Sequence, residues 1–270
     1  MFLWRLFGRK FLLTAFIVYL LLPMVLIMIG SVGKKWYGTI LPEGFTLDWY
    51  QKLFSNFIFV RALRMSFFIA TLVVLINMAI GIPAVYAIYV SQKKYLKRFF
   101  DNFVMLPVAV SPLVIGMGLI QAYNWPFFTL IGTWEILLFA HCVFTIPFMM
   151  KPVMANFEMI NWGELDEAAE SLGGKGWFKA RRVLIPNLLP GILAGSLMSF
   201  SISLGEFPLA VLLSGSLTQT YPVALYQAFY FPVGFACAAT FLLLFAALIS
   251  LLGMTFLMRF TGVRREDFAI

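Results

Sequence analysis

The segment ELDEAAESLGGKGWFKARRVLIPNLLP, residues 164–190, is the longest polar interruption in an otherwise apolar sequence. Within it, apolar residues recur at helical spacing and predict a short helix with one narrow apolar face. The residues of this face are Leu165, Ala168, Ala169 and Leu172. Small side chains on such a face would let a partner surface approach closely. We therefore expect the segment to be a docking element for another protein.

Residue types at the ends of this helix support the prediction. Asn161 is expected to be its N-cap, with Glu164 three residues later, and acidic residues occupy the first turns, where the helix dipole favours them. Gly173 and Gly174 provide a break at which a left-handed or tight turn costs little. A second short amphipathic helix is predicted after the break, and Pro186 suits the start of the next helix.

The composition is that of a multispanning membrane protein. Of the 270 residues, 62% are hydrophobic and only 12% are charged, which is about half the charge that a soluble domain needs for its surface. Long unbroken apolar runs indicate helices and disfavour a transmembrane barrel, whose strands would alternate over about ten residues. The net charge of +8 comes from small basic groups at the ends of apolar runs, so it indicates topology and no nucleic-acid partner.

Hydropathy predicts an all-α protein with about six transmembrane helices. A shorter helix at the membrane interface is expected to follow the first span, with Thr46 as its N-cap and Trp49 nearby. Pro107 and Pro112 are expected to bend the third span. The expected spans cover residues 11–30, about 66–90, about 103–123, about 134–150, about 191–214 and about 235–260.

The basic residues predict the orientation of the chain. With these spans, 15 of the 20 lysines and arginines fall on the side of the docking segment, together with both termini. The positive-inside rule therefore places that side in the cytoplasm. The other side holds Lys34, Lys35, Lys52, Arg61 and Arg64.

The fifth span contains the clearest intramembrane pattern. Small residues repeat every four positions and predict close packing against another helix; they are Gly191, Gly195, Ser199 and Ser203. Glu206 continues this face three residues after Ser203. Because an ionisable group in a span is costly, we expect Glu206, with the two serines, to face a water-lined pathway or gate. The alternative is a structural carboxylate, either paired across a helix interface or protonated.

Few residues suggest other chemistry. His141 is the only histidine and is expected to be packed and hydrogen-bonded, and the two cysteines, Cys142 and Cys237, fall inside spans. We predict no disulfide, no metal site and no catalytic residues. The sequence contains no Walker-type glycine loop, so the chain is not expected to hydrolyse ATP itself.

One spaced pattern in the docking segment resembles a known family. Glu167-Ala168-Ala169, then Gly173, then Val183-Leu184-Ile185-Pro186 keep every spacing of the EAA loop in permease subunits of ATP-binding-cassette (ABC) importers. The departures are Val183 and Ile185, where Ile and Leu are commoner. The resemblance implies a type I ABC importer permease fold, with residues 1–270 as a single transmembrane permease domain and residues 161–190 as the cytoplasmic coupling loop. The implied ATPase-coupling residues are Leu165, Glu167, Ala168, Ala169, Leu172, Gly173 and Pro186.

The same resemblance implies an assembly in the bacterial cytoplasmic (inner) membrane. Its partners would be a second, related permease subunit, a cytoplasmic ABC ATPase dimer that holds ATP and Mg, and an extracytoplasmic solute-binding protein. The branch resemblance favours a polyamine such as spermidine or putrescine, with phosphonates, ferric iron and inorganic anions as alternatives. The alternative function is that of a secondary transporter or channel, which works without an ATPase.

Overall fold

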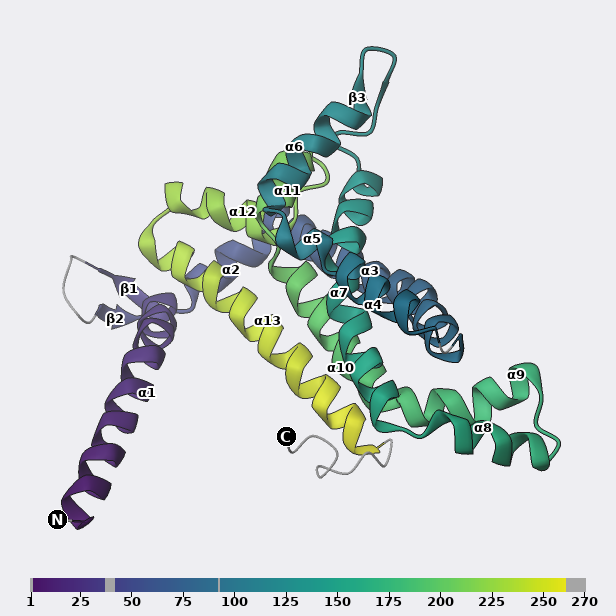
Figure 1. The fold of residues 1–270 in the computed structure, drawn as a ribbon. Coiled ribbons are helices and arrows are strands. Elements are labelled where there is room, and N and C mark those ends of the chain that lie inside the picture. The colour runs from purple at the N-terminus through teal and green to yellow at the C-terminus, as the bar shows by residue number, and fades with distance from the viewer. Residues whose placement is uncertain (1, 37–41, 92, 261–270) are drawn as a thin grey trace. The chain divides into compact units, whose positions relative to one another are not determined.

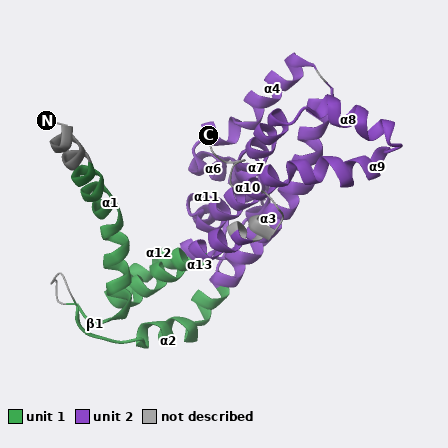
Figure 2. Cartoon of the chain, turned by 90° about the horizontal axis from the view of Figure 1, so that it is seen from below, with its two compact units in different colours: residues 1–61, 224–246 green, residues 62–223, 247–270 purple. Residues whose placement is uncertain are grey.

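The computed structural model describes residues 2–36, 42–91 and 93–260, and most of these residues are helical (Figure 1). The chain divides into two compact units (Figure 2). The first unit comprises residues 1–61 and 224–246, and the second comprises residues 62–223 and 247–270. Arg264 and Arg265, which entered the charge count, lie outside the described residues.

The first unit contains α1 (Phe2–Val32), the antiparallel pair β1 (Gly33–Lys35) and β2 (Glu43–Phe45), α2 (Asp48–Ser55) and the beginning of α13 (Val233–Phe260). Trp49 holds α2 in place, because its Nε1 donates a hydrogen bond of 2.7 Å to the Gly33 carbonyl and its ring packs on Gly234. A helix is therefore present where the interface helix was predicted. Its boundary residue is Leu47, while Thr46 Oγ1 accepts a hydrogen bond of 3.1 Å from the Asp48 N–H.

The second unit carries the docking segment and most of the spans. Its elements in chain order are α3 (Phe57–Val90), α4 (Lys94–Val104), α5 (Leu106–Ala109), α6 (Pro112–Tyr123), the hairpin of β3 (Asn124–Trp125) and β4 (Phe128–Thr129), α7 (Trp134–Met159), α8 (Trp162–Ser171), α9 (Gly176–Lys179), the π-helical turn η1 (Ala180–Leu184), α10 (Ile185–Gly205) and α11 (Pro208–Leu213). The helix α12 (Tyr221–Gln227) passes from the second unit into the first at residue 224, and the 3-10 turn η2 (Ala228–Tyr230) of the first unit leads to α13.

Five helical segments in the described part of the chain are long and apolar enough to cross a membrane, and the number is six when a bent pair of helices is counted as one span. The prediction of about six spans in an all-α chain is therefore confirmed. The five segments are Lys10–Val32, Phe57–Val90, Trp134–Met159, Gly176–Gly205 and Val233–Gly253.

The third span differs from the continuous helix predicted for residues 103–123. It consists of Lys94–Ala109 and Pro112–Tyr123, which meet at an angle of 89°. Ser111 has an extended backbone (φ −58°, ψ 135°), as expected for a residue directly before proline, where steric clash disfavours helix. The predicted bend is therefore present as a complete break.

The helices α7 and α10 form the centre of the second unit. A Cβ atom added to Gly195 would lie 2.5 Å from the Met149 carbonyl oxygen, and one added to Gly191 would lie 2.7 Å from the Pro152 carbonyl oxygen. The backbones thus approach so closely that only glycine fits, and the predicted packing role of the small-residue pattern is confirmed at these positions.

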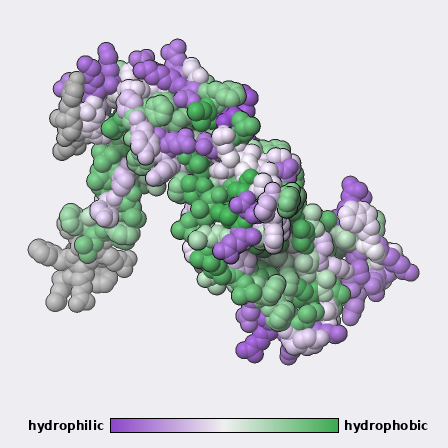
Figure 3. Space-filling view, turned by 90° about the horizontal axis from the view of Figure 1, so that it is seen from above, coloured by the Kyte–Doolittle hydropathy of each residue, from purple (hydrophilic) through white to green (hydrophobic). Residues whose placement is uncertain are grey.

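The two ends of α7 separate the hairpin from the docking segment. A helix of 26 residues is about 39 Å long, more than the hydrocarbon core of about 30 Å. The β3–β4 hairpin precedes α7 and α8 follows it, so they lie at opposite ends of a helix long enough to cross a membrane. Lys97 Nζ lies 2.6 Å from Glu158 Oε1, which puts the basic group of α4 at the α8 end. Figure 3 shows an apolar bundle surface with hydrophilic side chains gathered where α8 and α9 project.

Candidate functional site

The docking segment is a helical hairpin closed by glycines. Gly173 has a φ of +78° and Gly176 has a φ of +51°, both in the left-handed region that favours glycine. The Gly173 N–H donates to the Glu170 carbonyl (2.9 Å) and the Gly174 N–H donates to the Ala169 carbonyl (2.8 Å), which is how glycine ends a helix. The predicted break after the first helix is confirmed.

The apolar residues of α8 do not form the single exposed face that was predicted. Leu165 is half-buried and Ala169 is buried within the chain, whereas Ala168 is exposed and the Leu172 side chain is 89% exposed. The prediction was wrong on this point because α8 folds back on its own chain, so that two adjacent helical positions have different surroundings. The side of α8 that a partner can reach consists of Glu164, Glu167, Ala168, Ser171 and Leu172.

An ion-pair cluster joins α8 to the next helix. Lys179, on α9, pairs with Asp166 and lies 3.0 Å from Glu170 Oε1. The two carboxylates are four residues apart and so lie on one side of α8. Sequence reasoning missed this clamp, although an i, i+4 acidic pair followed by a lysine beyond a glycine turn is a signal that could have suggested it.

The helix after the turn is longer than predicted. It continues from Gly176 through η1 into α10 and ends at Gly205, so no loop separates the docking segment from the fifth span. Pro186 is the second residue of α10, but α10 continues η1 directly, so Pro186 does not begin a separate helix as predicted. Asn161 occupies the N-cap position of α8, as predicted, but its side chain makes no capping hydrogen bond.

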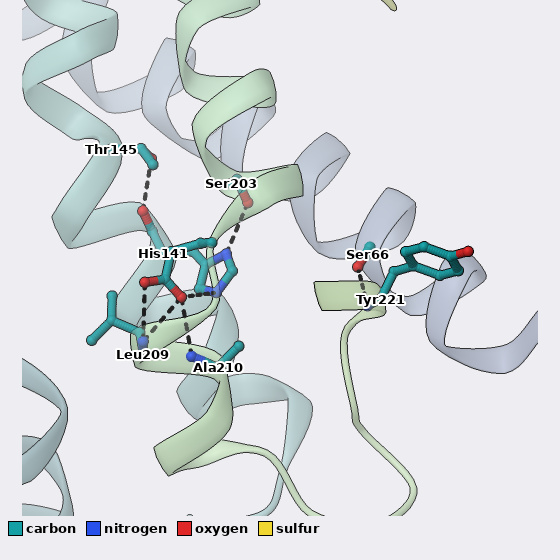
Figure 4. Close-up of polar contacts among 8 residues, drawn as sticks. Ser66, His141, Thr145, Ser203, Leu209, Ala210 and Tyr221 are labelled. Carbon is teal, nitrogen blue, oxygen red and sulfur yellow. Dashed lines mark hydrogen bonds and ion pairs between the residues drawn. The ribbon is translucent and has the colours of Figure 1, made fainter. Parts of the chain in front are cut away.

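Glu206 lies at the break between α10 and α11. Its side chain is buried, with 5% exposure for the residue, and its carboxylate accepts hydrogen bonds of 3.0 Å from the backbone N–H groups of Leu209 and Ala210 (Figure 4). These are N–H groups of the first turn of α11, which have no acceptor within the helix. The carboxylate therefore caps α11, because α10 ends at Gly205 and α11 begins at Pro208.

A buried histidine connects Glu206 to the neighbouring helices. His141 Nδ1 lies 2.9 Å from Ser203 Oγ, and its Nε2 lies 3.8 Å from Glu206 Oε2. On the same helix Thr145 Oγ1 donates to the His141 carbonyl (2.7 Å) and accepts from Asn77 Nδ2 (2.9 Å). These contacts link α3, α7 and α10 across 62 to 68 residues of sequence. The predicted packed, hydrogen-bonded role of His141 is confirmed.

The predicted pathway residues are thus turned toward the interior of the chain. Ser199, Ser203 and Glu206 are all buried, and Ser199 Oγ lies 3.4 Å from the Thr145 carbonyl oxygen of α7. This geometry agrees with the alternative prediction that the Glu206 carboxylate has a structural role. The opposite side of α10 is open, with Met198 and Ser201 exposed.

We expect removal of the Glu206 carboxylate to destabilise the protein. Glu206→Ala leaves two buried N–H groups without an acceptor, at a cost of about 1–3 kcal/mol, while Glu206→Gln keeps one acceptor oxygen and costs less. Glu135→Ala, at an exposed carboxylate in the first turn of α7, serves as the control with a smaller effect. Thermal unfolding of the purified variants measures the difference, and equal midpoints for Glu206→Ala and the unmodified chain would contradict the capping role.

Comparisons with known proteins agree with these features. Residues 78–263, well over half of the chain, match the family described as "Binding-protein-dependent transport system inner membrane component". The chain is 30% identical over 215 residues to PhnV of Salmonella paratyphi A, named as a 2-aminoethylphosphonate transport system permease protein, with 78% of each chain covered. It is 28% identical over 223 residues to the spermidine/putrescine transport system permease protein PotC of Escherichia coli, with 80% of each covered.

Solved structures confirm the predicted fold class. The chain superposes on one chain of a bacterial alginate ABC transporter, crystallised in complex with an alginate pentasaccharide-bound periplasmic protein, with a TM-score of 0.72 and 19% identity over 96% of this chain and 98% of that one. The inward-facing MetNI methionine ABC transporter gives a TM-score of 0.64 with 18% identity, covering 77% of this chain and 97% of that one. The chain therefore belongs to the binding-protein-dependent inner membrane component family, as the multi-pass permease component of an ABC importer that is not itself the ATPase.

Proposed function

We propose that this chain, as a single permease domain, forms half of a translocation pathway and couples to a cytoplasmic ABC ATPase dimer through the outer side of α8. The main observation that supports this coupling role is the exposure of Leu172 beside Ala168 on a hydrophilic projection. A large apolar side chain in such a place is suited to a groove on a partner protein, and the neighbouring Glu164 and Glu167 could approach basic side chains at its rim.

The helical hairpin of α8 and α9 provides a mechanical link from α8 to the membrane. ATP and Mg would be bound by the ATPase subunits, and closure of that dimer would draw together the α8 helices of two permease chains. The Lys179 clamp and the glycine turn make α8 move with α9, and α9 continues without a loop to Gly205. Displacement of α8 would then tilt α10 and alternate access to the pathway.

The remaining partners follow from this arrangement. Both termini and α8 lie in the cytoplasm in the proposed orientation, and the β3–β4 hairpin faces a solute-binding protein outside. The alginate transporter that shares the fold was crystallised with a periplasmic protein, which supports such a partner. We propose a related chain as the second permease. A secondary transporter or channel is set aside, because the family belongs to binding-protein-dependent transport systems and the solved structures with this fold are ABC transporters.

The side of α10 that is free within this chain is proposed to face the pathway or the second permease. It contains Ala194, Met198, Ser201 and Gly205, which recur at helical spacing opposite the buried serines. Met198 is 49% exposed, and Gly205 has no atom within 4 Å of an added Cβ. This assignment replaces the Ser199, Ser203 and Glu206 side that the sequence pattern suggested.

Cysteine labelling separates the two sides of α10. In a background with Cys142 and Cys237 replaced, Ser201→Cys in the assembled importer is expected to react with a water-soluble maleimide at a rate that changes when ATP is added. Ser203→Cys, two residues away and 3% exposed, is the matched control and is expected to stay unlabelled. Labelling of Ser203→Cys with protection of Ser201→Cys would assign the pathway to the other side.

For the solute, we propose a small aminoalkyl compound. The names of PhnV and PotC point to 2-aminoethylphosphonate and to spermidine or putrescine, and these solutes share a primary ammonium group on a short alkyl chain. Polyamines remain our first choice and 2-aminoethylphosphonate the second. Solute selection would lie mainly with the binding protein.

Reconstitution tests both the function and the solute. The permease pair, the ATPase and the binding protein are placed in proteoliposomes, and ATP hydrolysis and uptake are measured with spermidine, putrescine or 2-aminoethylphosphonate. We expect one solute class to accelerate hydrolysis together with uptake. Uptake that persists when the ATPase carries an inactive Walker lysine would overturn the proposed function.

A further inference from the structure

An apolar groove runs between α3 and the continuous α9–α10 helix. It has a volume of about 510 Å³, and its walls are almost entirely apolar. Leu75 and Tyr86 mark its extent along α3, and a separation of eleven residues corresponds to about 16 Å. This is about half the thickness of a hydrocarbon core of about 30 Å. The groove therefore has the depth of one lipid leaflet.

A basic and aromatic pocket lies at one end of this groove. Trp177 lines both cavities, and Phe178, Arg181 and Arg182 line the second one. The Arg182 guanidinium lies 5.8 Å from the centre of the Phe178 ring. No carboxylate within the described part of the chain lies within 4.0 Å of either arginine, in contrast to Lys179, which is held by Asp166 and Glu170. The two guanidinium groups are thus available to an anion.

We propose that this combined site binds an anionic phospholipid of the leaflet on the α8 side. One acyl chain would occupy the groove, the Trp177 ring would lie at the boundary between chain and headgroup, and Arg181 and Arg182 would bind the phosphate. Tryptophan is enriched at the membrane–water interface, at the level of the headgroups. Arginine forms bidentate hydrogen bonds with phosphate, and basic pockets between membrane helices bind anionic headgroups.

The site would make the coupling element sensitive to the membrane. Trp177 and Arg181 belong to the helix that joins α8 to α10, and Tyr86 of the opposite wall packs edge-on against Trp162 of α8, with ring centres 5.8 Å apart. A lipid in the groove would therefore hold α3 and α9 together next to α8, the proposed coupling helix. This inference depends on the membrane location and does not require the proposed solute or coupling face.

Lipid retention by the purified importer tests the site. Native mass spectrometry and lipid extraction count the phosphatidylglycerol and phosphatidylethanolamine that stay bound. We expect preferential retention of phosphatidylglycerol, reduced about five-fold or more for each arginine removed in Arg181→Gln and Arg182→Gln. Ala180→Trp, which fills the groove, should displace the lipid while leaving the arginines in place.

A matched variant and a competing anion complete the experiment. Arg98→Gln, an exposed arginine of α4, should leave retention unchanged. Inorganic phosphate at millimolar concentration should not displace the lipid, whereas displacement would show a site for free phosphate instead. Equal phosphatidylglycerol retention by the double arginine variant and the unmodified importer would overturn the proposal. A photo-crosslinker at Ala79 that captures protein in place of lipid would also overturn it. Neither readout depends on transport activity.

Discussion

Replacing Gly195 by leucine is expected to leave little or no folded permease in the membrane. The new Cβ atom would lie 2.5 Å from the Met149 carbonyl oxygen and 2.9 Å from the Met149 sulfur. The carbonyl belongs to the backbone of α7 and cannot rotate away, so α7 and α10 would have to separate. Overpacking of a core typically costs about 1–3 kcal/mol, and here a rigid helix backbone has to move, so a larger cost is expected. Fluorescence-detected size exclusion measures the amount of monodisperse protein.

Gly118→Leu provides the control for this substitution. Gly118 also lies in a helix of the second unit, but an added Cβ would meet nothing within 4 Å. It is expected to be tolerated, which separates the steric effect from the general effect of leucine in a span. If Gly195→Leu and Gly118→Leu gave the same yield of folded protein, the close contact between α7 and α10 would be incorrect.

Replacing Ala168 by tryptophan is expected to reduce uptake strongly while the permease still folds. Ala168 is exposed next to Leu172, so the larger ring meets no part of the described chain that must move to accept it. It would instead prevent α8 from entering a groove on the ATPase. Uptake into proteoliposomes should fall by about ten-fold or more, as when a buried interface contact worth roughly 1.4 kcal/mol is lost. Binding of the ATPase to the immobilised permease should weaken in parallel.

Ala168→Ser is the conservative control, because it changes polarity and hardly changes size. Uptake close to that of the unmodified importer is expected for this variant. Normal uptake by Ala168→Trp, or lost uptake with undiminished ATPase binding, would show that this side of α8 is not the docking surface.

Local properties of the sequence were sufficient to predict most of the fold and the family. Hydropathy located the spans because burial in a bilayer requires a long apolar run whatever its neighbours are. Glycine spacing predicted that another helix packs closely on Gly191 and Gly195, and Gly173 predicted a left-handed or tight turn. The spaced Glu-Ala-Ala pattern indicated the ABC importer permease family, which the comparisons show. Each signal depends on residues that are close together in the chain.

The tertiary structure decided which side chains face outward and which are paired. Ala168 and Ala169 are neighbours in sequence, yet one is exposed and the other is buried because the hairpin folds α8 onto its own chain. Glu206 had several candidate roles until its hydrogen bonds to α11 and its proximity to His141 were known. Periodicity shows that residues share a face of a helix, but only the packing of distant segments determines what that face contacts.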